Sequence, residues 1–285
     1  MRTAIRRHPL LVFFALAYSI SWTIWAPLWL PAFGVQGLPV APFHHALGAV
    51  GPLSAAFVVS AWESGRTGPR ELLRAMVQWR GATHWLAVAL LAPYALLAIA
   101  ITATSLVDGT TVSLAGLGRS REFAEFSAVA FLAYNIVSFG FGEEVGWRGY
   151  ALSRLQARHS ALIASLLLTV GWALWHLPLF LYRPGYTSMS AAGVVGWFFS
   201  LLTGAVLLTW LYNESRGSLL VVAVFHATID VAFTSELAAP RVVSAAGALI
   251  TLWGIVVLVT MGPRHLSRRG KRVHMPADDR TSKMT

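Results

Sequence analysis

Long apolar runs, separated by short segments that carry arginine, make up most of the chain. A helix rises about 1.5 Å per residue and the hydrocarbon core of a bilayer is about 30 Å thick, so about 20 apolar residues can cross it. The pattern therefore predicts an all-α, polytopic membrane bundle of about eight transmembrane helices. The predicted spans are residues 10–30, 46–62, 85–107, 123–141, 161–182, 194–212, 219–233 and 242–261.

The first two spans need separate interpretation. Residues 10–30 follow three arginines as a signal peptide would, but the run is too long for one and no small-residue cleavage site follows it. We interpret it as a retained helix. The second span is short and carries Gly51 and Pro52, which predicts a tilted, kinked or partly crossing helix.

The positions of Lys and Arg predict the orientation, because cytoplasmic loops carry the excess of positive charge. With the N-terminus inside, the segments predicted as cytoplasmic hold 18 of the 22 Lys and Arg residues, and the other side holds 4. Both termini are therefore expected in the cytoplasm, with the protein in the plasma membrane. The four exceptions are Arg119, Arg121, Arg183 and Arg241.

Two polar stretches are predicted to lie at the inner surface. Residues 1–262 are expected to form one transmembrane domain, and residues 263–285 a basic, disordered cytoplasmic tail that rests on anionic lipid. Between Arg148 and His159, the alternation of apolar and basic residues predicts a short amphipathic helix on the inner interface.

Composition narrows the class further. The chain is 56% hydrophobic and 12% charged, which is too apolar for a soluble domain. It has no cysteine, so disulfides, thiolate metal sites and a cysteine nucleophile are excluded. The net charge of +10 does not indicate nucleic-acid binding, because the arginines are spread along the chain.

Glu143, Glu144 and Arg148 interrupt this apolar pattern. They follow residues 126–141, which carry no charge, and an ionisable group at membrane depth costs at least a few kcal/mol. Glu144 and Arg148 stand four apart and are expected to pair on one helix face. Glu143 is rotated by about 100° from Glu144, so this pair does not explain it.

Two further apolar runs carry histidine. His176 lies four residues after Trp172 and shortly before Pro178, which bends a helix and exposes backbone groups. His226 and Asp230 are also four apart and project together, so they can bond to each other or jointly hold a water or a metal. The combined residues are those needed to activate a water and stabilise an oxyanion.

Three motifs in this order resemble the CPBP family, also called Abi, of intramembrane proteases. That family includes the type II CAAX prenyl endopeptidases and bacterial relatives that process bacteriocins or confer immunity to them. The resemblance covers a core of about residues 123–234, although Trp172 replaces the commoner Phe, and Asp230 the Asn of the eukaryotic CAAX enzymes. The motifs are Glu143-Glu144-x-x-x-Arg148, Trp172-x-x-x-His176 and His226-x-x-x-Asp230.

The resemblance implies a role for each residue. Glu143 is expected to activate a water that His176 helps to hold, while His226 and Asp230 stabilise the oxyanion. A buried carboxyl suits this task because it can take and return a proton near neutral pH. The residues expected to support the site are Glu144, Arg148 and Trp172.

Metal dependence and depth stay open at this point. Zinc held by His176, His226 and Glu143 is the alternative to a cofactor-free mechanism, since two imidazoles and a carboxylate are a known ligand set. No local two-histidine motif occurs, which favours the metal-free version. The predicted topology puts Glu143 near the cytoplasmic side and His176 nearer the far face, so a shared site requires a tilted helix or a deeper Glu143.

The sequence therefore predicts an intramembrane endopeptidase that cuts a peptide or protein substrate near the cytoplasmic side. A non-catalytic membrane interaction or immunity protein, using the same polar residues structurally, is the alternative. A small transporter with the carboxylates as a proton relay is a third reading, disfavoured because no inverted repeat is visible. The sequence indicates neither the substrate, nor whether it is prenylated, nor the oligomeric state.

Overall fold

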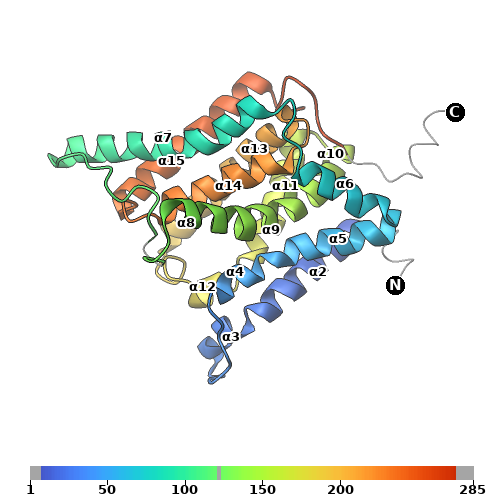
Figure 1. Ribbon diagram of the computed structural model, residues 1–285, viewed down its shortest axis with the longest axis horizontal. Coiled ribbons are helices and arrows are strands. Elements are labelled where there is room, and N and C mark those ends of the chain that lie inside the picture. The colour runs from blue at the N-terminus through green and yellow to red at the C-terminus, as the bar shows by residue number, and fades with distance from the viewer. Residues whose placement is uncertain (1–7, 121–122, 274–285) are drawn as a thin grey trace.

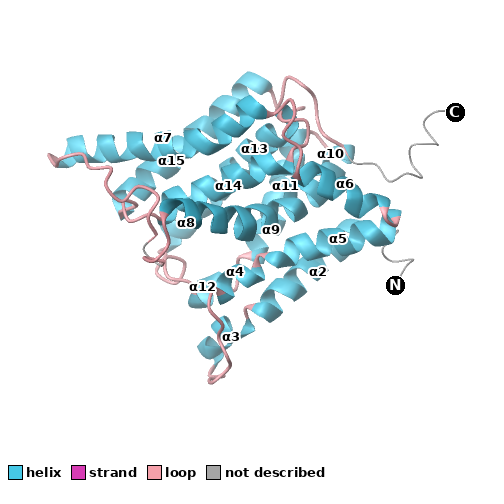
Figure 2. Cartoon of the chain, viewed as in Figure 1, coloured by secondary structure: helices cyan, strands magenta, loops and turns pink. Residues whose placement is uncertain are grey.

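The computed structural model describes residues 8–120 and 123–273. Within these residues, all regular secondary-structure elements are helices. Figures 1 and 2 show helices packed side by side, with short loops at their ends and no strand among the described residues. A single bridge joins Ser120 to Ser235. The predicted all-α class is confirmed.

Helices occupy all eight predicted runs. Five are long and apolar enough to cross a membrane: His44–Ser64, which joins α4 (His44–Gly48) and α5 (Val50–Ser64); α7 (Thr83–Asp108); Ala161–Tyr182, which joins α11 (Ala161–Trp175) and α12 (Leu179–Tyr182); α13 (Ala191–Glu214); and α15 (Pro240–Met261). The second span thus has 21 residues and is longer than the sequence suggested. By length and composition the structure supports five spans, and further spans beyond these stay predictions.

The first run is a bent helix pair that would raise the count to six. It comprises α2 (Pro9–Ile24), α3 (Ala26–Trp29) and the 3-10 turn η1 (Leu30–Phe33), with a bend of 58°. Proline in the first turns of α3 and η1 accounts for the break, because it cannot donate to the preceding turn. The seventh run is the shorter α14 (Leu219–Thr234).

One continuous helical stretch positions the two glutamates. It runs through α8 (Ala128–Asn135), the π-helix η2 (Ile136–Phe141), α9 (Gly142–Glu144), the π-helix η3 (Val145–Leu152) and α10 (Ser153–Arg158). Every residue from 142 to 154 is buried. The predicted amphipathic helix from Arg148 to His159 is therefore wrong as a surface element: its first half is in the core, where Arg148 is ion-paired.

This stretch and α14 lie at the centre of the bundle. Figure 1 shows α7 and α15 along one side and α2 and α5 along the other, with α8, α9 and α14 between them. Close backbone contacts hold the π-helices in place: a Cβ on Gly140 would lie 2.5 Å from the Ala223 carbonyl oxygen, and one on Gly146 would lie 2.6 Å from that of Pro52. Only glycine permits these approaches.

Part of the expected tail is packed against the bundle. Backbone N–H groups of Ala161 and Leu162 donate to the carbonyls of Arg264 and Pro263. Asn213 donates to the carbonyl of His265, and Leu266 is fully buried. Predicted disorder therefore does not describe residues 263–273, because buried amide and carbonyl groups supply their hydrogen bonds; residues 274–285 lie outside the described residues.

Candidate active site

A cavity of about 750 Å³ lies within the bundle and collects the residues singled out in the sequence. Glu143, His176, His226 and Asp230 all line it. They come from three separate elements: α9, the end of α11, and α14. The structure thus brings the four predicted catalytic residues to one space.

The continuous helix from α8 to α10 explains how Glu143 and His176, which the predicted topology put at different depths, can share one site. Glu143 lies 15 residues before Arg158, where α10 ends, and His176 lies 15 residues after Ala161, where α11 begins. Two antiparallel neighbours joined by a short turn therefore bring both residues to about 20 Å from that turn. Glu143 lies midway along its helix, so the deeper placement of Glu143 accounts for the shared site, and its distance from the membrane surface stays a prediction.

Glu143 is buried, with 4% of its surface exposed, and two indoles hold its carboxylate. Trp172 Nε1 donates to Oε2 at 2.8 Å, and Trp147 Nε1 donates to the same oxygen at 3.2 Å. The sequence interpretation left Glu143 without a structural partner, which is wrong. Trp147 was missed, although its i+4 spacing from Glu143 is a readable signal.

Glu144 forms the predicted pair with Arg148 and also contacts a histidine. Arg148 Nη1 donates to Glu144 Oε1 at 2.8 Å, and both side chains are fully buried. His226 Nδ1 lies 2.6 Å from that oxygen, so it donates there. The Arg148 guanidinium also lies over the Trp172 ring, 4.6 Å from its centroid. Glu144 therefore braces the helix and orients His226.

His226 and Asp230 are neighbours, as their spacing predicts. Nε2 of His226 lies 3.6 Å from Asp230 Oδ2, so the pair is close without a short hydrogen bond. The His226 side chain is 9% exposed and the Asp230 side chain 32% exposed. His226 is thus fixed through Nδ1, while Nε2 is on the side shared with Asp230.

His176 is fixed in a comparable way. Its Nδ1 lies 2.7 Å from the Trp172 carbonyl oxygen, which can only accept, so Nδ1 carries the proton and Nε2 is the acceptor. Aromatic rings surround the imidazole. They are Trp172 at 5.8 Å, Trp175 at 5.0 Å, Trp197 at 5.6 Å and Tyr186 at 6.2 Å between ring centroids.

Two residues that line the cavity, Tyr186 and His45, were not predicted from the sequence. Tyr186 comes from the loop before α13 and stacks on His176, with 14° between the ring planes. His45 stacks on Trp25, and its Nδ1 lies 2.7 Å from the Tyr182 hydroxyl. Neither stands in a helical spacing with the three motifs, so only the tertiary fold reveals them.

The predicted zinc ligands do not form a cluster. Among the described residues, no three His, Asp or Glu side chains are placed to hold one metal ion together. His226 Nδ1 already bonds Glu144, and Glu143 Oε2 already accepts from two indoles. The donors named for zinc therefore do not fit a metal site in this geometry.

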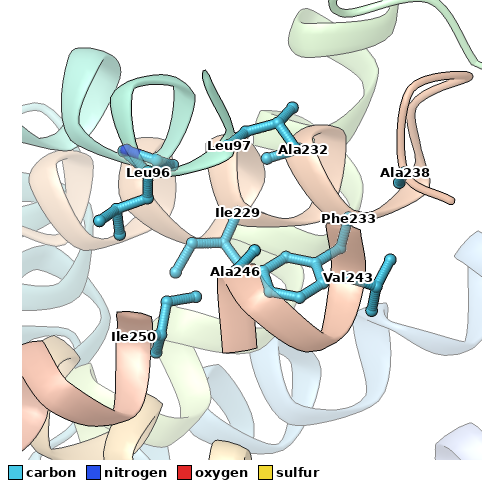
Figure 3. Close-up of a pocket in the computed structure, with 10 residues that line it drawn as sticks. Leu96, Leu97, Ile229, Ala232, Phe233, Ala238, Val243, Ala246 and Ile250 are labelled. Carbon is cyan, nitrogen blue, oxygen red and sulfur yellow. The ribbon is translucent and has the colours of Figure 1, made fainter. Parts of the chain in front are cut away.

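A second pocket is lined by apolar residues. It lies between α7, α14 and α15 and has room for about 10 Å³. The side chains drawn in Figure 3 are apolar and fill the space between these helices, among them Leu97, Ile229 and Phe233. We interpret it as a packing gap.

Comparison with known proteins agrees with the motif analysis. Residues 125–232 match the family described as "Type II CAAX prenyl endopeptidase Rce1-like". Over 110 residues the chain is 34% identical to "CAAX prenyl protease 2" of Methanococcus maripaludis, covering 37% of this chain. The match spans about two fifths of that relative's length (40%). The CPBP resemblance is confirmed over the segment that holds the three motifs.

Proposed function

We propose that this chain is a membrane endopeptidase, and the match of residues 125–232 to the Rce1-like family supports this. One observation carries the proposal. The Glu143 carboxylate is held by two indole N–H groups at the wall of a cavity that His176 and His226 also line. A fixed base beside two fixed imidazoles is what hydrolysis by an activated water requires.

Glu143 acts as the general base. It takes a proton from a water that His176 Nε2 helps to hold, and the hydroxide attacks the peptide carbonyl carbon. The proton on Glu143 then passes to the leaving amine as the C–N bond breaks, so the carboxylate is restored. The indole N–H groups of Trp147 and Trp172 keep Oε2 in place, which leaves Oε1 for the water.

His226 stabilises the oxyanion. Glu144 accepts from Nδ1, which favours the imidazolium and leaves Nε2–H to donate to the developing negative charge. Asp230, 3.6 Å from Nε2, either shares this task as a neutral donor or keeps the imidazolium charged as an anion. No step passes through a metal, because the donors present do not fit one.

A non-catalytic interaction protein is the second candidate, and a specific observation favours it. Glu143, Glu144, Arg148 and His226 already bond to other side chains of the fold. A network of polar side chains bonded to one another in this way can serve stability alone. Under that function, replacing the Glu143 carboxylate by an amide changes no phenotype.

The test is hydrolysis of a fluorescence-quenched peptide library by the purified protein in detergent. We expect cleavage by the wild type and a loss of at least about 100-fold in Glu143→Gln, the lower end of a general-base contribution. Glu214→Gln is the matched control, since Glu214 is 5% exposed and bonds the backbone N–H of Arg268, remote from the cavity. Equal rates in wild type and Glu143→Gln reject the proposal. Metal content is measured on the same samples.

A further inference from the structure

The two ends of the bundle are distinct in charge. One end holds the turns around α6 (Thr67–Met76), the end of α10, the turn after α13 and residues 263–273. These segments are joined there: the Ser218 hydroxyl donates to the Gln78 carbonyl at 2.6 Å, and Lys271 Nζ to the His159 carbonyl at 2.9 Å. Nine exposed arginines gather at this end, which we call the basic end. They are Arg66, Arg70, Arg74, Arg80, Arg158, Arg216, Arg264, Arg268 and Arg269.

The opposite end carries few positive charges. It holds the loops before α4, before α8, before α13 and before α15, which the Ser120 to Ser235 bridge helps to join. The described basic residues there are Arg119, Arg183 and Arg241, and Arg241 is paired with Asp108. In Figure 1, α6 and α10 lie towards the right, whereas α3, α8 and α12 lie towards the left and below.

The cavity opens at the end opposite the basic end. Its outer wall is built from the loop before α4, the loop before α8 and the loop before α13, where Ala41, Phe43 and Gly185 are exposed. Its inner wall is built from Glu143, at 4% exposed, and His226, at 8% exposed. Exposure therefore rises from the catalytic residues towards these loops, which we call the mouth.

Positive charge in the loops of membrane proteins marks the cytoplasmic side. Applied to this fold, the rule places the basic end in the cytoplasm and the mouth on the other side. We propose that the cavity receives its substrate from the non-cytoplasmic side, and that this substrate is an apolar segment of an exported peptide. That the occupant is a substrate rests on the proposed function, whereas the orientation of the cavity does not.

Side chains at the mouth indicate an apolar occupant. Phe43 packs against Phe123, Phe126 and Tyr134, with ring centroids 5.2, 5.8 and 5.6 Å apart. Phe43 has φ of +58° and is 41% exposed, so the backbone adopts a left-handed conformation to present this ring at the rim. An aromatic rim on which Phe43 is exposed and its three neighbours are half-buried, beside a cavity of this size, suits apolar side chains of an extended peptide.

The chain contains no cysteine, so single cysteines report the orientation directly. Ala41→Cys at the mouth and Ala157→Cys beside Arg158 at the basic end are a matched pair, since both alanines are exposed. The two variants are expressed in a bacterial membrane and treated with a membrane-impermeant maleimide. Intact spheroplasts and inverted vesicles are compared, with unaltered protein as the blank.

We expect at least about a fivefold excess of labelling of Ala41→Cys in spheroplasts over vesicles, and the reverse for Ala157→Cys. The opposite pattern, or equal labelling of both variants in both preparations, overturns the proposal. In the same vesicles, a quenched peptide added from outside should be cut by right-side-out and not by inverted membranes. If the labelling is as expected but no peptide is cut even in detergent, the endopeptidase function fails and the orientation stands.

Discussion

Glu143 and Glu144 are adjacent buried carboxylates whose amide replacements should have opposite consequences. In Glu143→Gln, the side-chain carbonyl can still accept from Trp147 and Trp172, while the amino group takes the place of Oε1. Each hydrogen bond loses the extra strength of a charged acceptor, roughly 1 kcal/mol. Removal of a buried charge offsets this loss, so we expect the unfolding free energy to change by no more than about 1 kcal/mol.

Glu144→Gln removes one partner of a buried ion pair. Its Oε1 accepts from Arg148 at 2.8 Å and from His226 at 2.6 Å, and both Glu144 and Arg148 are fully buried. Breaking such a pair costs about 3–5 kcal/mol, because the remaining charge stays desolvated. At roughly 2–4 °C per kcal/mol, the melting temperature should fall by on the order of 10 °C.

Both quantities can be measured on one preparation. Thermal unfolding in detergent gives the melting temperature, and cleavage of the quenched peptide gives kcat/KM. We expect Glu143→Gln to melt within about 4 °C of the wild type, with activity reduced at least about 100-fold. Glu144→Gln should melt far lower and, below its melting temperature, keep more activity than Glu143→Gln.

The opposite result for the two variants would refute these roles of Glu143 and Glu144. If Glu143→Gln unfolds as early as Glu144→Gln while the folded fraction keeps full activity, then Glu143 is structural. Glu214→Gln, which alters a remote carboxylate of similar burial, defines the change in melting temperature that a generic amide substitution causes.

Four further outcomes are expected. Asp230→Asn should keep kcat/KM within about tenfold of the wild type, because an amide can still donate to the oxyanion, whereas Asp230→Ala should lose about 100-fold. Tyr186→Phe should keep the ring against His176 and leave the rate unchanged, whereas Tyr186→Ala should lower kcat by about tenfold. Gly146→Ala should destabilise by about 1–3 kcal/mol, measured by thermal unfolding, because its Cβ would lie 2.6 Å from Pro52. Dialysis against EDTA should leave hydrolysis unchanged, since the described residues hold no three-ligand cluster.

Local spacing accounts for the part of the site that the sequence could predict. Glu144 with Arg148, and His226 with Asp230, are i,i+4 pairs, and helix geometry alone brings each pair together. Contacts between different helices were not predictable in this way. The bond from Trp172 to Glu143 joins residues 29 apart, and that from His226 to Glu144 joins residues 82 apart.

Hydropathy located the helices and misjudged where two polar segments lie. Residues 148–159 alternate apolar and basic side chains, which predicted an interface, but the guanidiniums of Arg148 and Arg154 are ion-paired inside the fold with Glu144 and Glu63. The same applies to residues 263–273, whose polar backbone is bonded to buried groups such as Asn213. Composition cannot distinguish a polar segment in water from one whose partners are elsewhere in the chain.

Two π-helices flank the glutamates, so the orientation of the site residues depends on the number of residues in this helical stretch. η2 and η3 each widen the helix by hydrogen bonds from i to i+5, and they enclose the three residues of α9. A turn bonded from i to i+5 holds about one residue more than an α turn, so deleting one residue from η2 would return it to the α form and keep its two flanks aligned. An inserted residue would instead rotate one flank against the other by about 100°, and the carboxylates and Arg148 could then no longer face the cavity and the core together. The site should therefore tolerate a single deletion in η2 better than a single insertion.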